Sequence, residues 1–281
     1  MNIESARSPR ADGLSVSIVV YRPDRAQLKR TLMSLGTACE RLRAARPDLH
    51  ATLYLIDNGG LGPEPDAFAA LRAKRMACEI LSGHGNVGFG PGHNLAIERA
   101  ASALHLVLNP DIDLDPSALV NACDFFESHS EAGLLTPWIG DTDGEQQYLC
   151  RRYPSLADLF IRGFMPASIR RRFARRLARY ELRDRINALD VFWDPPIVSG
   201  CFMLFRTNVL KRLGGFDPRY FLYFEDYDLS LRTHEVAQIV YVPSVRVVHY
   251  GGGAARKGSA HIRMFVTSAF KFFNRFGWRV C

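Results

Sequence analysis

The sequence predicts an α/β fold in which a mostly parallel central sheet is flanked by helices. Short apolar runs alternate with amphipathic segments between residues 15 and 108, and this alternation builds right-handed βαβ units. Polar residues follow the apolar runs, at the carboxyl ends of the predicted strands. Ligands bind beyond these ends in such sheets. The first half of the chain is therefore predicted to bind a ligand.

The elements of this half follow one another with short connections. The apolar run 15–20 predicts a buried strand, and residues 24–46 predict a helix because their apolar residues recur at spacings of four and three. The elements expected next are a strand at 51–56, a helix at about 64–76, a strand at 78–82, a glycine-rich loop at 83–92, a helix at about 93–103 and a strand at 104–108.

The pattern changes beyond residue 145. We expect an arginine-rich helical insertion at 155–186, a strand at 197–205, a helix at 226–236, two short strands at 238–249 broken by Pro243, and an amphipathic helix at about 260–276. No internal repeat or low-complexity linker divides the chain. A single domain, 15–281, is therefore expected after a flexible N-terminus, 1–14.

Positive charge is concentrated in the predicted insertion. The 281 residues carry a net charge of +7, and eleven arginines but only three acids lie between Arg151 and Arg185. Within this segment an apolar stripe (Ile169, Phe173, Leu177 and Tyr180) is flanked by cations, as in helices that bind anionic membrane surfaces. The alternative is a solvated helix whose stripe lies in the protein core. No recognition motif for nucleic acid accompanies the charge, so nucleic acid is not an expected partner.

The cysteines and the N-terminus favour a cytoplasmic protein. Six scattered cysteines show no metal-ligand spacing, and residues 1–13 lack the apolar core of a signal peptide. No stretch approaches the length of an apolar membrane span. We expect the protein in the reducing cytoplasm, peripherally bound to the inner face of the cell membrane.

Two clusters follow strands in the first half. Residues 83–88 match the dinucleotide pattern G-x-G-x-x-G, but they follow the third strand instead of the first, which argues against nicotinamide or flavin. A loop with positive backbone angles explains the glycines but not Asn86 and Asn94. Asn109-Pro-Asp111-Ile-Asp113 supplies the oxygen ligands that hard divalent cations prefer. A helix-start turn would explain Asp115 but not Asp111.

Two further clusters lie in the second half. Residues 221–228 combine Glu225, Asp226 and Asp228 with four aromatic residues. Helix capping needs one of these acids, and a carboxylate that accepts a proton from a hydroxyl is a general base. His249 precedes a glycine run followed by Arg256 and Lys257, which suits a phosphate-bearing ligand.

Together these segments resemble the family-2 glycosyltransferases of the GT-A fold. The resemblance extends from about Ser15 to Gly277 and is closest to the rhamnosyltransferase-like branch that builds bacterial surface polysaccharides, such as lipopolysaccharide. It rests on seven motifs in order: SIVVYRPD, LIDNGG, GNVGFGPGHNLAI, LNPDIDL, VSGCFMLFR, GGFDPRYFLYFEDYDLSLR and VRVVHYGGG. It implies a Rossmann-like nucleotide-binding half at 15–115 and an acceptor-binding half at 116–281.

The resemblance also implies a role for each cluster. Asp226 stands at the position of the general base, with Glu225 beside it. Asn109-Pro-Asp111 stands at the position of the D-x-D motif, although Asn109 replaces its first acid. The residues implied in nucleotide-sugar binding are Tyr21, Asp57, Asn58, Asn86, Gly88, Asn94, Asn109, Asp111, Ser199, Gly200, Arg256 and Lys257. Those implied in binding Mg²⁺ or Mn²⁺ are Asp111, Asp113 and His249.

The implied activity is that of an inverting, metal-dependent, hexosyltransferase-type enzyme. It would move a sugar, by resemblance L-rhamnose from dTDP-rhamnose, to a hydroxyl of a saccharide or lipid-linked acceptor. One alternative is a nucleotidyltransferase that makes the sugar nucleotide, but Tyr21-Arg-Pro-Asp24 is not the glycine- and lysine-rich loop it would need after the first strand. Another is a non-catalytic, basic membrane-surface protein on a transferase fold. The presence of Asp111, Asp226 and His249 argues against it.

Overall fold

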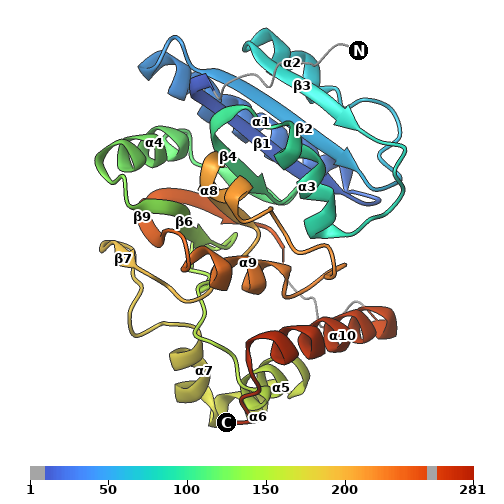
Figure 1. The fold of residues 1–281 in the computed structure, drawn as a ribbon, viewed down its shortest axis with the longest axis vertical. Coiled ribbons are helices and arrows are strands. Elements are labelled where there is room, and N and C mark those ends of the chain that lie inside the picture. Colours follow the sequence, from blue (N-terminus) through green and yellow to red (C-terminus); the bar gives the residue numbers. More distant parts are fainter. Residues whose placement is uncertain (1–9, 252–257) are drawn as a thin grey trace.

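A nine-stranded sheet runs through the molecule, with helices on both faces (Figure 1). The computed structural model describes residues 10–251 and 258–281. The strand order is β3-β2-β1-β4-β8-β6-β9-β5, and β7 pairs with β9 outside this path. The predicted α/β fold with a central sheet and flanking helices is therefore confirmed.

The N-terminal half is the parallel part of the sheet. Its strands, β3, β2, β1 and β4, pair only in parallel with one another, as the alternation of strands and helices predicts. The strands are β1 (Arg10–Val20), β2 (His50–Asp57), β3 (Met76–Leu81) and β4 (Ser102–Leu108), and the connecting helices are α1 (Arg25–Ala45), α2 (Ala67–Ala73) and α3 (Phe89–Arg99). Residues 10–14, expected in a flexible N-terminus, instead belong to β1, because they pair with β2 and β4.

The C-terminal half is mixed, so "mostly parallel" holds only for the first half. β8 pairs antiparallel with both β4 and β6, and β9 pairs parallel with β6 but antiparallel with β5 and β7. The strands are β5 (Ile112–Leu114), β6 (Ala132–Gly140), β7 (Phe192–Trp193), β8 (Phe202–Arg206) and β9 (Gln238–His249), and the helices are α4 (Ala118–Ser128), α8 (Thr207–Arg212) and α9 (Glu225–Thr233).

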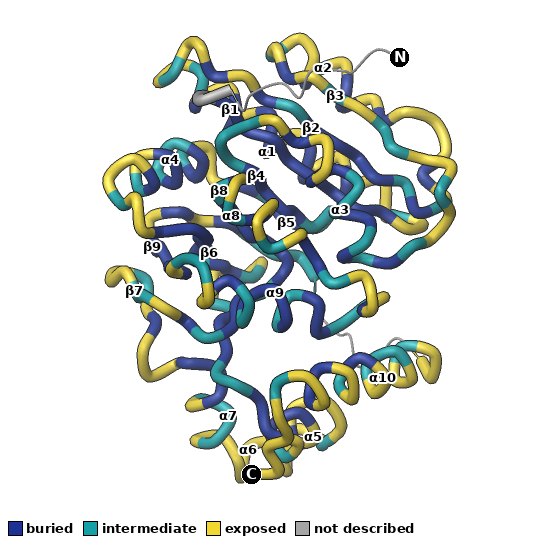
Figure 2. The backbone as a smooth tube through the Cα atoms, in the orientation of Figure 1, coloured by how far each residue is buried: buried dark blue, intermediate teal, exposed yellow. Residues whose placement is uncertain are grey.

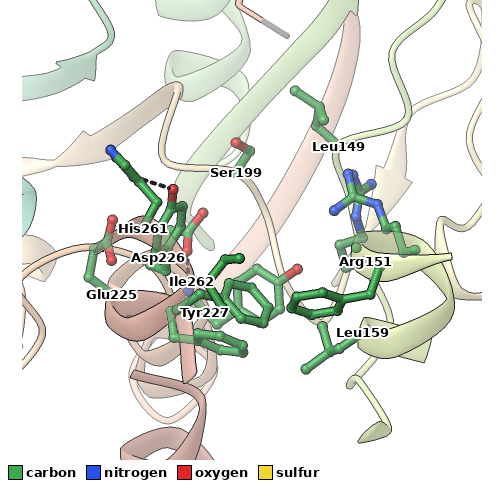
Figure 3. Close-up of a pocket in the computed structure, with 15 residues that line it drawn as sticks. Leu149, Arg151, Leu159, Ser199, Glu225, Asp226, Tyr227, His261 and Ile262 are labelled. Carbon is green, nitrogen blue, oxygen red and sulfur yellow. Dashed lines mark hydrogen bonds between the residues drawn. The ribbon is translucent and has the colours of Figure 1, made fainter. Parts of the chain in front are cut away.

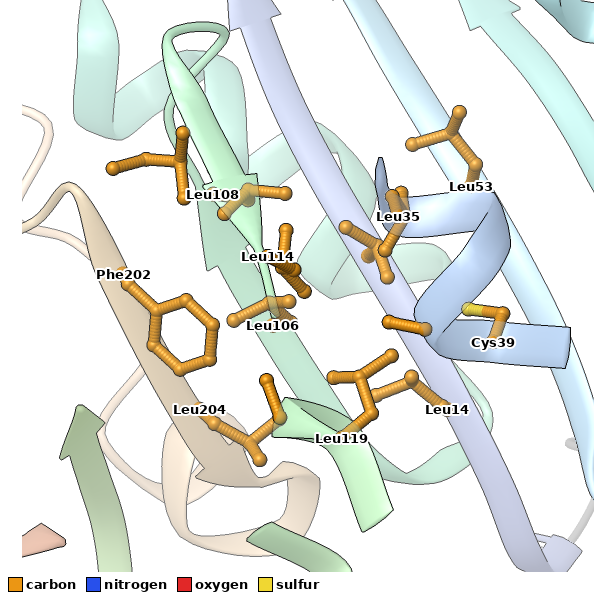
Figure 4. Close-up of a cluster of buried hydrophobic side chains, with 14 of the residues drawn as sticks. Leu14, Leu35, Cys39, Leu53, Leu106, Leu108, Leu114, Leu119, Phe202 and Leu204 are labelled. Atoms are coloured by element: carbon orange, nitrogen blue, oxygen red, sulfur yellow. The ribbon is translucent and has the colours of Figure 1, made fainter. Parts of the chain in front are cut away.

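Side chains of alternate residues divide the core between the two faces of the sheet. Leu14, Val16 and Ile18 of β1 pack with α1, α2 and α4 in the largest buried cluster, part of which Figure 4 shows. The opposite face packs against α3, α8 and α9 in two smaller clusters. Because strand side chains alternate with a period of two, both faces of the central strands are buried.

Two strands of the C-terminal half, β9 and β8, differ from their expected bounds. β9 is one strand instead of two, and Pro243 lies where three extra residues bulge out between the pairs Pro137–Val242 and Trp138–Arg246. A bulge accommodates proline because no ladder hydrogen bond is required there. β8 begins at Phe202, because residues 199–201 leave the ladder and contact α9.

The arginine-rich insertion folds as three short helices: α5 (Leu156–Phe164), α6 (Ala167–Arg172) and α7 (Ala174–Tyr180). Pro166 ends the helical run of α5, because the residue before a proline disfavours the α conformation. An ion pair of 2.6 Å between Arg176 and Asp158 then draws α7 back onto α5. The expected continuous apolar stripe is therefore wrong: Ile169 and Phe173 are exposed, whereas Tyr180 is buried.

The last helix, α10 (Gly258–Phe276), packs beside the insertion at the end of the molecule away from β3 (Figure 1). Phe272 and Phe273 are fully buried against Leu159 of α5 and Phe224 before α9. The outer sides of α5, α6 and α10 are exposed (Figure 2). Within residues 10–251 and 258–281, no helix combines the length and the apolar character that crossing a bilayer requires.

Candidate functional site

The loops after β2 and β3 meet at the carboxyl edge of the sheet. Asp57 accepts hydrogen bonds from the backbone N–H groups of Gly59 and Leu61 through one carboxylate oxygen. Asn58 is buried and donates to the carbonyl of Gly88 (2.9 Å) and to the side chain of Asn86 (3.2 Å). The predicted nucleotide-binding residues of these two loops therefore form one connected group.

Tyr21 lies beside this group at the end of β1. Its side chain is about half exposed, and its ring borders Gly59. The neighbouring Arg22 donates its backbone N–H to the Gly59 carbonyl (2.8 Å). The exposed ring of Tyr21 therefore offers a planar ligand a surface to stack on, close to the loop that holds Asp57.

The glycine-rich loop is fixed to the segment that precedes α9. The N–H of Phe89 donates to the Phe221 carbonyl (2.9 Å), and a side chain at Gly88 would collide with that carbonyl. Asn94 uses both ends of its amide on the backbone of Phe216. Asn94, predicted to contact the nucleotide sugar, thus joins the two loops through its side chain.

Asp111 and His249 meet at the β5–β9 edge, as the sequence predicts. The pairing of Ile112 with His249 brings them together, and Asp111 Oδ2 lies 3.5 Å from His249 Nε2. The Tyr250 N–H donates to the Asp111 carbonyl (2.9 Å). Gly251 lies against both side chains, and a Cβ at this position would occupy the space beside them.

Gln147, which the sequence analysis missed, orients His249. Its amide nitrogen donates to the His249 carbonyl (2.9 Å), so its oxygen faces His249 Nδ1 at 3.1 Å. Nδ1 must therefore carry a proton, and when the ring holds only this proton Nε2 presents a lone pair to the Asp111 carboxylate. Two acceptors that face each other in this way fit a bound cation. No sequence motif marks Gln147, because it lies outside every cluster.

Other atoms at this edge also fit a divalent cation. Asn109 Oδ1 and Asp111 Oδ1 are buried without a hydrogen-bond partner, and such atoms usually have a ligand, ion or water. Asp113 Oδ1 is likewise buried without a hydrogen-bond partner, although within the described residues no three acidic, histidine or cysteine side chains gather at metal-binding distances. Burial, and then the Asp113 carboxylate, raise the pKa of Tyr250. Arg256 and Lys257 lie outside the described residues.

Glu225 and Asp226 lie at a strained helix start. Tyr223 and Phe224 both have positive φ (70° and 65°), which is costly for bulky residues and aims the first turn of α9 inward. Asp226 accepts hydrogen bonds from the backbone N–H groups of Gly200 (3.0 Å) and Tyr227 (3.0 Å). Asp228, the third acid of the cluster, is instead neutralised by Arg232 and Arg275.

Burial raises the pKa of both acids at this helix start. For Glu225 the main cause is desolvation, followed by the charge of Asp226, and the pKa rises well above its ordinary value. Desolvation also raises the pKa of Asp226, while the N–H groups of Gly200 and Tyr227 oppose the rise. Glu225 Oε2 has no hydrogen-bond partner. Both acids are therefore costly to ionise, but only Asp226 has backbone N–H groups that partly offset this cost, and buried acids with raised pKa values are typical of sites that transfer protons.

A single segment, 199–201, connects the acid pair to the Asp111 edge. Gly200 donates to Asp226, and the carbonyl of the next residue, Cys201, accepts the N–H of Asn109 (2.9 Å). A Cβ at Gly200 would press on Asp226 and Phe89. The predicted residues Ser199 and Gly200 thus belong to the segment that connects the acid pair to the candidate cation site.

A cavity of about 280 Å³ opens beside Asp226, between α5, α9 and α10 (Figure 3). Ser199 and Asp226 lie on one side of it, and Leu149 and Arg151 lie across from them. The rest of the lining is mainly apolar and aromatic. A partly apolar ligand would therefore fit in the cavity, next to the acid pair.

The chain resembles known sugar transferases in sequence. The family model "Glycosyltransferase like family 2" matches residues 78–265. The N-acetylglucosaminyl-diphospho-decaprenol L-rhamnosyltransferase of Mycobacterium tuberculosis is 32% identical, over 93% of this chain and 84% of that protein. Rhamnosyltransferase WbbL of Escherichia coli is 28% identical, over 70% of this chain and 74% of that protein.

Solved structures share the fold at lower sequence identity. The S. aureus TarS 1–349 fragment in complex with UDP has a TM-score of 0.55 at 15% identity; the match covers 93% of this chain and 65% of that chain. A mannosyltransferase of Pyrobaculum calidifontis, in complex with GDP-Man and Mn²⁺, has a TM-score of 0.57 at 15% identity, over 96% and 68% of the two chains.

The buried Glu225 predicts a pH-dependent stability. In the unfolded chain a glutamate titrates near pH ~4.3, whereas the pKa of folded Glu225 is raised. The folded state therefore binds more protons, and its stability falls as the pH rises from about 4 through the raised pKa. Glu225→Gln should melt at a higher temperature than the wild type at pH 8, by about 2–4 °C for each kcal/mol gained. The gain should vanish near pH 4, where both side chains are neutral.

Thermal melts of both proteins across this pH range test the prediction. Glu235→Gln, which removes an exposed acid just after the same helix, is the matched control and should show little change at any pH. A gain at pH 8 that persists unchanged at pH 4 would mean that the charge of Glu225 is not its cause.

Proposed function

The chain belongs to glycosyltransferase family 2, and from this premise we propose that it transfers L-rhamnose from dTDP-rhamnose, with inversion, to a hydroxyl of a lipid-linked saccharide. The choice of rhamnose rests on the two rhamnosyltransferases among its relatives. The lipid-linked acceptor follows the name of the mycobacterial relative and the apolar cavity beside Asp226. The product would enter a bacterial surface polysaccharide.

One observation carries the proposed chemistry: segment 199–201 holds the Asp226 carboxylate and the Asn109–Asp111 loop together. Displacement at a sugar requires a base at the attacking hydroxyl and positive charge at the departing diphosphate. Asp226 would supply the base, and a cation held at the Asn109–Asp111 loop would supply the positive charge; both are bonded to segment 199–201. The sugar would therefore lie over this segment.

Asp226 serves as the base in this proposal. Its carboxylate faces the cavity and accepts the proton of the acceptor hydroxyl as that oxygen attacks the anomeric carbon in line with the leaving diphosphate. The N–H groups of Gly200 and Tyr227 fix its position before the reaction. Glu225 lies beside it at the same helix start and supports the site.

Asp111 and His249 would hold a divalent cation, Mg²⁺ or Mn²⁺, with Gln147 fixing the His249 ring. When bound, the cation supplies positive charge to the donor diphosphate. Arg256 and Lys257, which follow His249 in the chain, are proposed to bind the donor diphosphate because the family resemblance implies this role. The nucleoside would lie on the loops of Asp57 and Asn86, beside the ring of Tyr21.

The exposed side of the insertion would bind the surface of the membrane that carries the acceptor. Phe160 and Phe164 of α5 and Val266 and Phe270 of α10 are each exposed by 44–57%. The exposed arginines of α6 lie beside them in the same lobe. Apolar side chains next to cations are typical of proteins that bind anionic bilayers.

We expect Asp226→Asn to lower kcat by about 10²–10⁴-fold, because an amide keeps the shape of the carboxylate but cannot accept the proton. Binding of dTDP should remain near the wild-type value. Because burial raises the pKa of Asp226, wild-type kcat/KM should fall on the acid side above the usual aspartate pKa of about 3.9. Steady-state kinetics from pH 4 to pH 9 measure both effects.

Glu225→Gln is the matched control for this experiment and should lose less activity than Asp226→Asn. If Asp226→Asn retains most of its turnover, or loses dTDP binding instead, Glu225 or Asp228 must be considered as the base.

A chelator should abolish transfer, and Mg²⁺ or Mn²⁺ should restore it. Gln147→Leu should weaken Mn²⁺ binding by about 10–100-fold, because a ligand histidine depends on the partner of its second ring nitrogen. Electron paramagnetic resonance of Mn²⁺ with dTDP measures this affinity without turnover. Gln146→Leu removes the adjacent glutamine, whose side chain bonds Tyr241 instead, and should bind Mn²⁺ nearly as the wild type does. Full turnover in excess chelator would contradict the metal assignment.

Replacing Arg170, Arg171 and Arg172 by glutamine should weaken binding to anionic vesicles. Each basic residue near such a surface contributes about 1 kcal/mol, so the loss should approach about 100-fold at low salt and shrink as salt screens the charges. Vesicle co-sedimentation measures it. Arg176 is left in place because it pairs with Asp158.

A variant with Lys29, Arg41 and Arg212 replaced by glutamine loses the same charge from exposed positions on α1 and α8, and should bind nearly as the wild type does. Equal losses in the two variants would show that net charge alone, and not the insertion, attracts the protein to the vesicle.

A further inference from the structure

Arg151 is a buried cation without a carboxylate partner. Its side chain lines the cavity beside Asp226 and is only 3% exposed. Its one side-chain hydrogen bond goes to the carbonyl of its neighbour Cys150 (3.0 Å), and its guanidinium lies 5.8 Å from the centre of the Tyr180 ring. Within the described residues no acid lies at ion-pair distance from it. An unpaired buried charge is costly, so it usually has an anionic partner.

The neighbouring arginines, unlike Arg151, form ion pairs with acids. Arg152 pairs with Asp184, Arg176 with Asp158, and Arg162 with Glu181. These arginines therefore contact acids of the insertion, Glu181 being shared by Arg162 and Arg183, whereas Arg151 contacts none of them. Its position is also fixed, because its backbone pairs with Ile197 through both the N–H and the carbonyl.

The remaining walls of the cavity indicate what accompanies the anion. They are formed largely by apolar side chains of α5, α10 and the segment before α5: Leu149, Leu159, Phe164, Ile262 and Phe265. Apolar walls do not stabilise a small inorganic anion. The cavity suits a molecule with a compact anionic group joined to an apolar chain.

We infer that this cavity is a subsite for an acceptor whose sugar is joined through a phosphate or diphosphate to an apolar chain, with Arg151 binding the phosphate. The inference rests on the proposed function, since Asp226 faces Arg151 across the same cavity (Figure 3). A phosphate on Arg151 would place the attached sugar between it and the Asp226 carboxylate. The apolar chain would then leave between α5 and α10, toward their exposed aromatic side chains.

The test compares two acceptors that differ only in the anionic group: a dodecyl glycoside and the matching dodecyl glycosyl diphosphate. The wild type should prefer the diphosphate in kcat/KM. Arg151→Gln should reduce that preference by about 10²-fold, the loss typical of truncating one partner of a buried charge pair. Arg151→Lys should restore part of the preference, because it retains the charge. Arg152→Gln is the matched control, because this neighbouring arginine pairs with Asp184 and is not part of the cavity lining, and it should change the preference much less.

Binding of dodecyl phosphate, measured by calorimetry against dodecyl maltoside, tests the subsite without turnover. Arg151→Gln should lose the phosphate-dependent part of this binding while its thermal melt remains cooperative and its dTDP binding is retained. If Arg151→Gln fails to fold, the lysine variant and the wild-type preference between the two acceptors still decide the question.

Three outcomes would overturn the inference. They are equal use of both acceptors by the wild type, equal losses in Arg151→Gln and Arg152→Gln, and a loss of phosphatidylglycerol vesicle binding in Arg151→Gln as large as that of the α6 variant. The last would assign Arg151 to the membrane surface. Transfer to neither acceptor, combined with Arg151-dependent binding of dodecyl phosphate, would instead contradict the proposed function and support the subsite.

Discussion

Two backbone hydrogen bonds from one short segment hold the functional site together. Gly200 donates its N–H to the Asp226 carboxylate, and the Cys201 carbonyl accepts the N–H of Asn109. The segment can do this because it leaves the ladder just before β8, which lies beside β4 in the sheet. The acid of α9 and the loop after β4 are separated by more than 100 residues in sequence, and this segment fixes the distance between them. Glycine suits this position, because a Cβ would lie 3.2 Å from Phe89 and 3.3 Å from Asp226 and so press on both.

Close backbone approach also joins the two halves of the chain on the nucleotide side. The glycine-rich loop lies directly on the carbonyl of Phe221, and Asn94 binds the backbone of Phe216. The same aromatic segment continues into Tyr223 and Phe224, whose positive φ angles direct the start of α9. The strain is tolerated because Phe224 is buried in the cluster formed with Phe272 of α10. The last helix of the chain therefore supports the geometry of the acid pair.

The sequence predicted the parts of the molecule that depend on local pattern. Alternating strands and helices gave the parallel half, and polar residues after strands located both Asp111 and His249, which lie side by side. It missed β6, where Pro137 and three glycines or threonines interrupt the apolar run. No local sequence pattern indicated that Gln147 or Arg151 belongs to a site. Their significance depends on which atoms they face, and partners more than 25 residues away in sequence leave no local pattern.

The arginines of the insertion show why composition alone could not assign its role. One group is neutralised by acids within the insertion, as Arg176 is by Asp158, and holds the three short helices together. A second group, on α6, is exposed and available to an anionic surface. Arg151 belongs to neither group, because it is buried without an acid beside it. A charge count treats all three alike, whereas burial and pairing separate arginines paired within the insertion, exposed arginines, and one buried arginine without an acid contact among the described residues. Arg151 is the member of this arginine-rich segment that combines burial, the lack of a contact with any described acid and a place in the lining of the cavity beside Asp226.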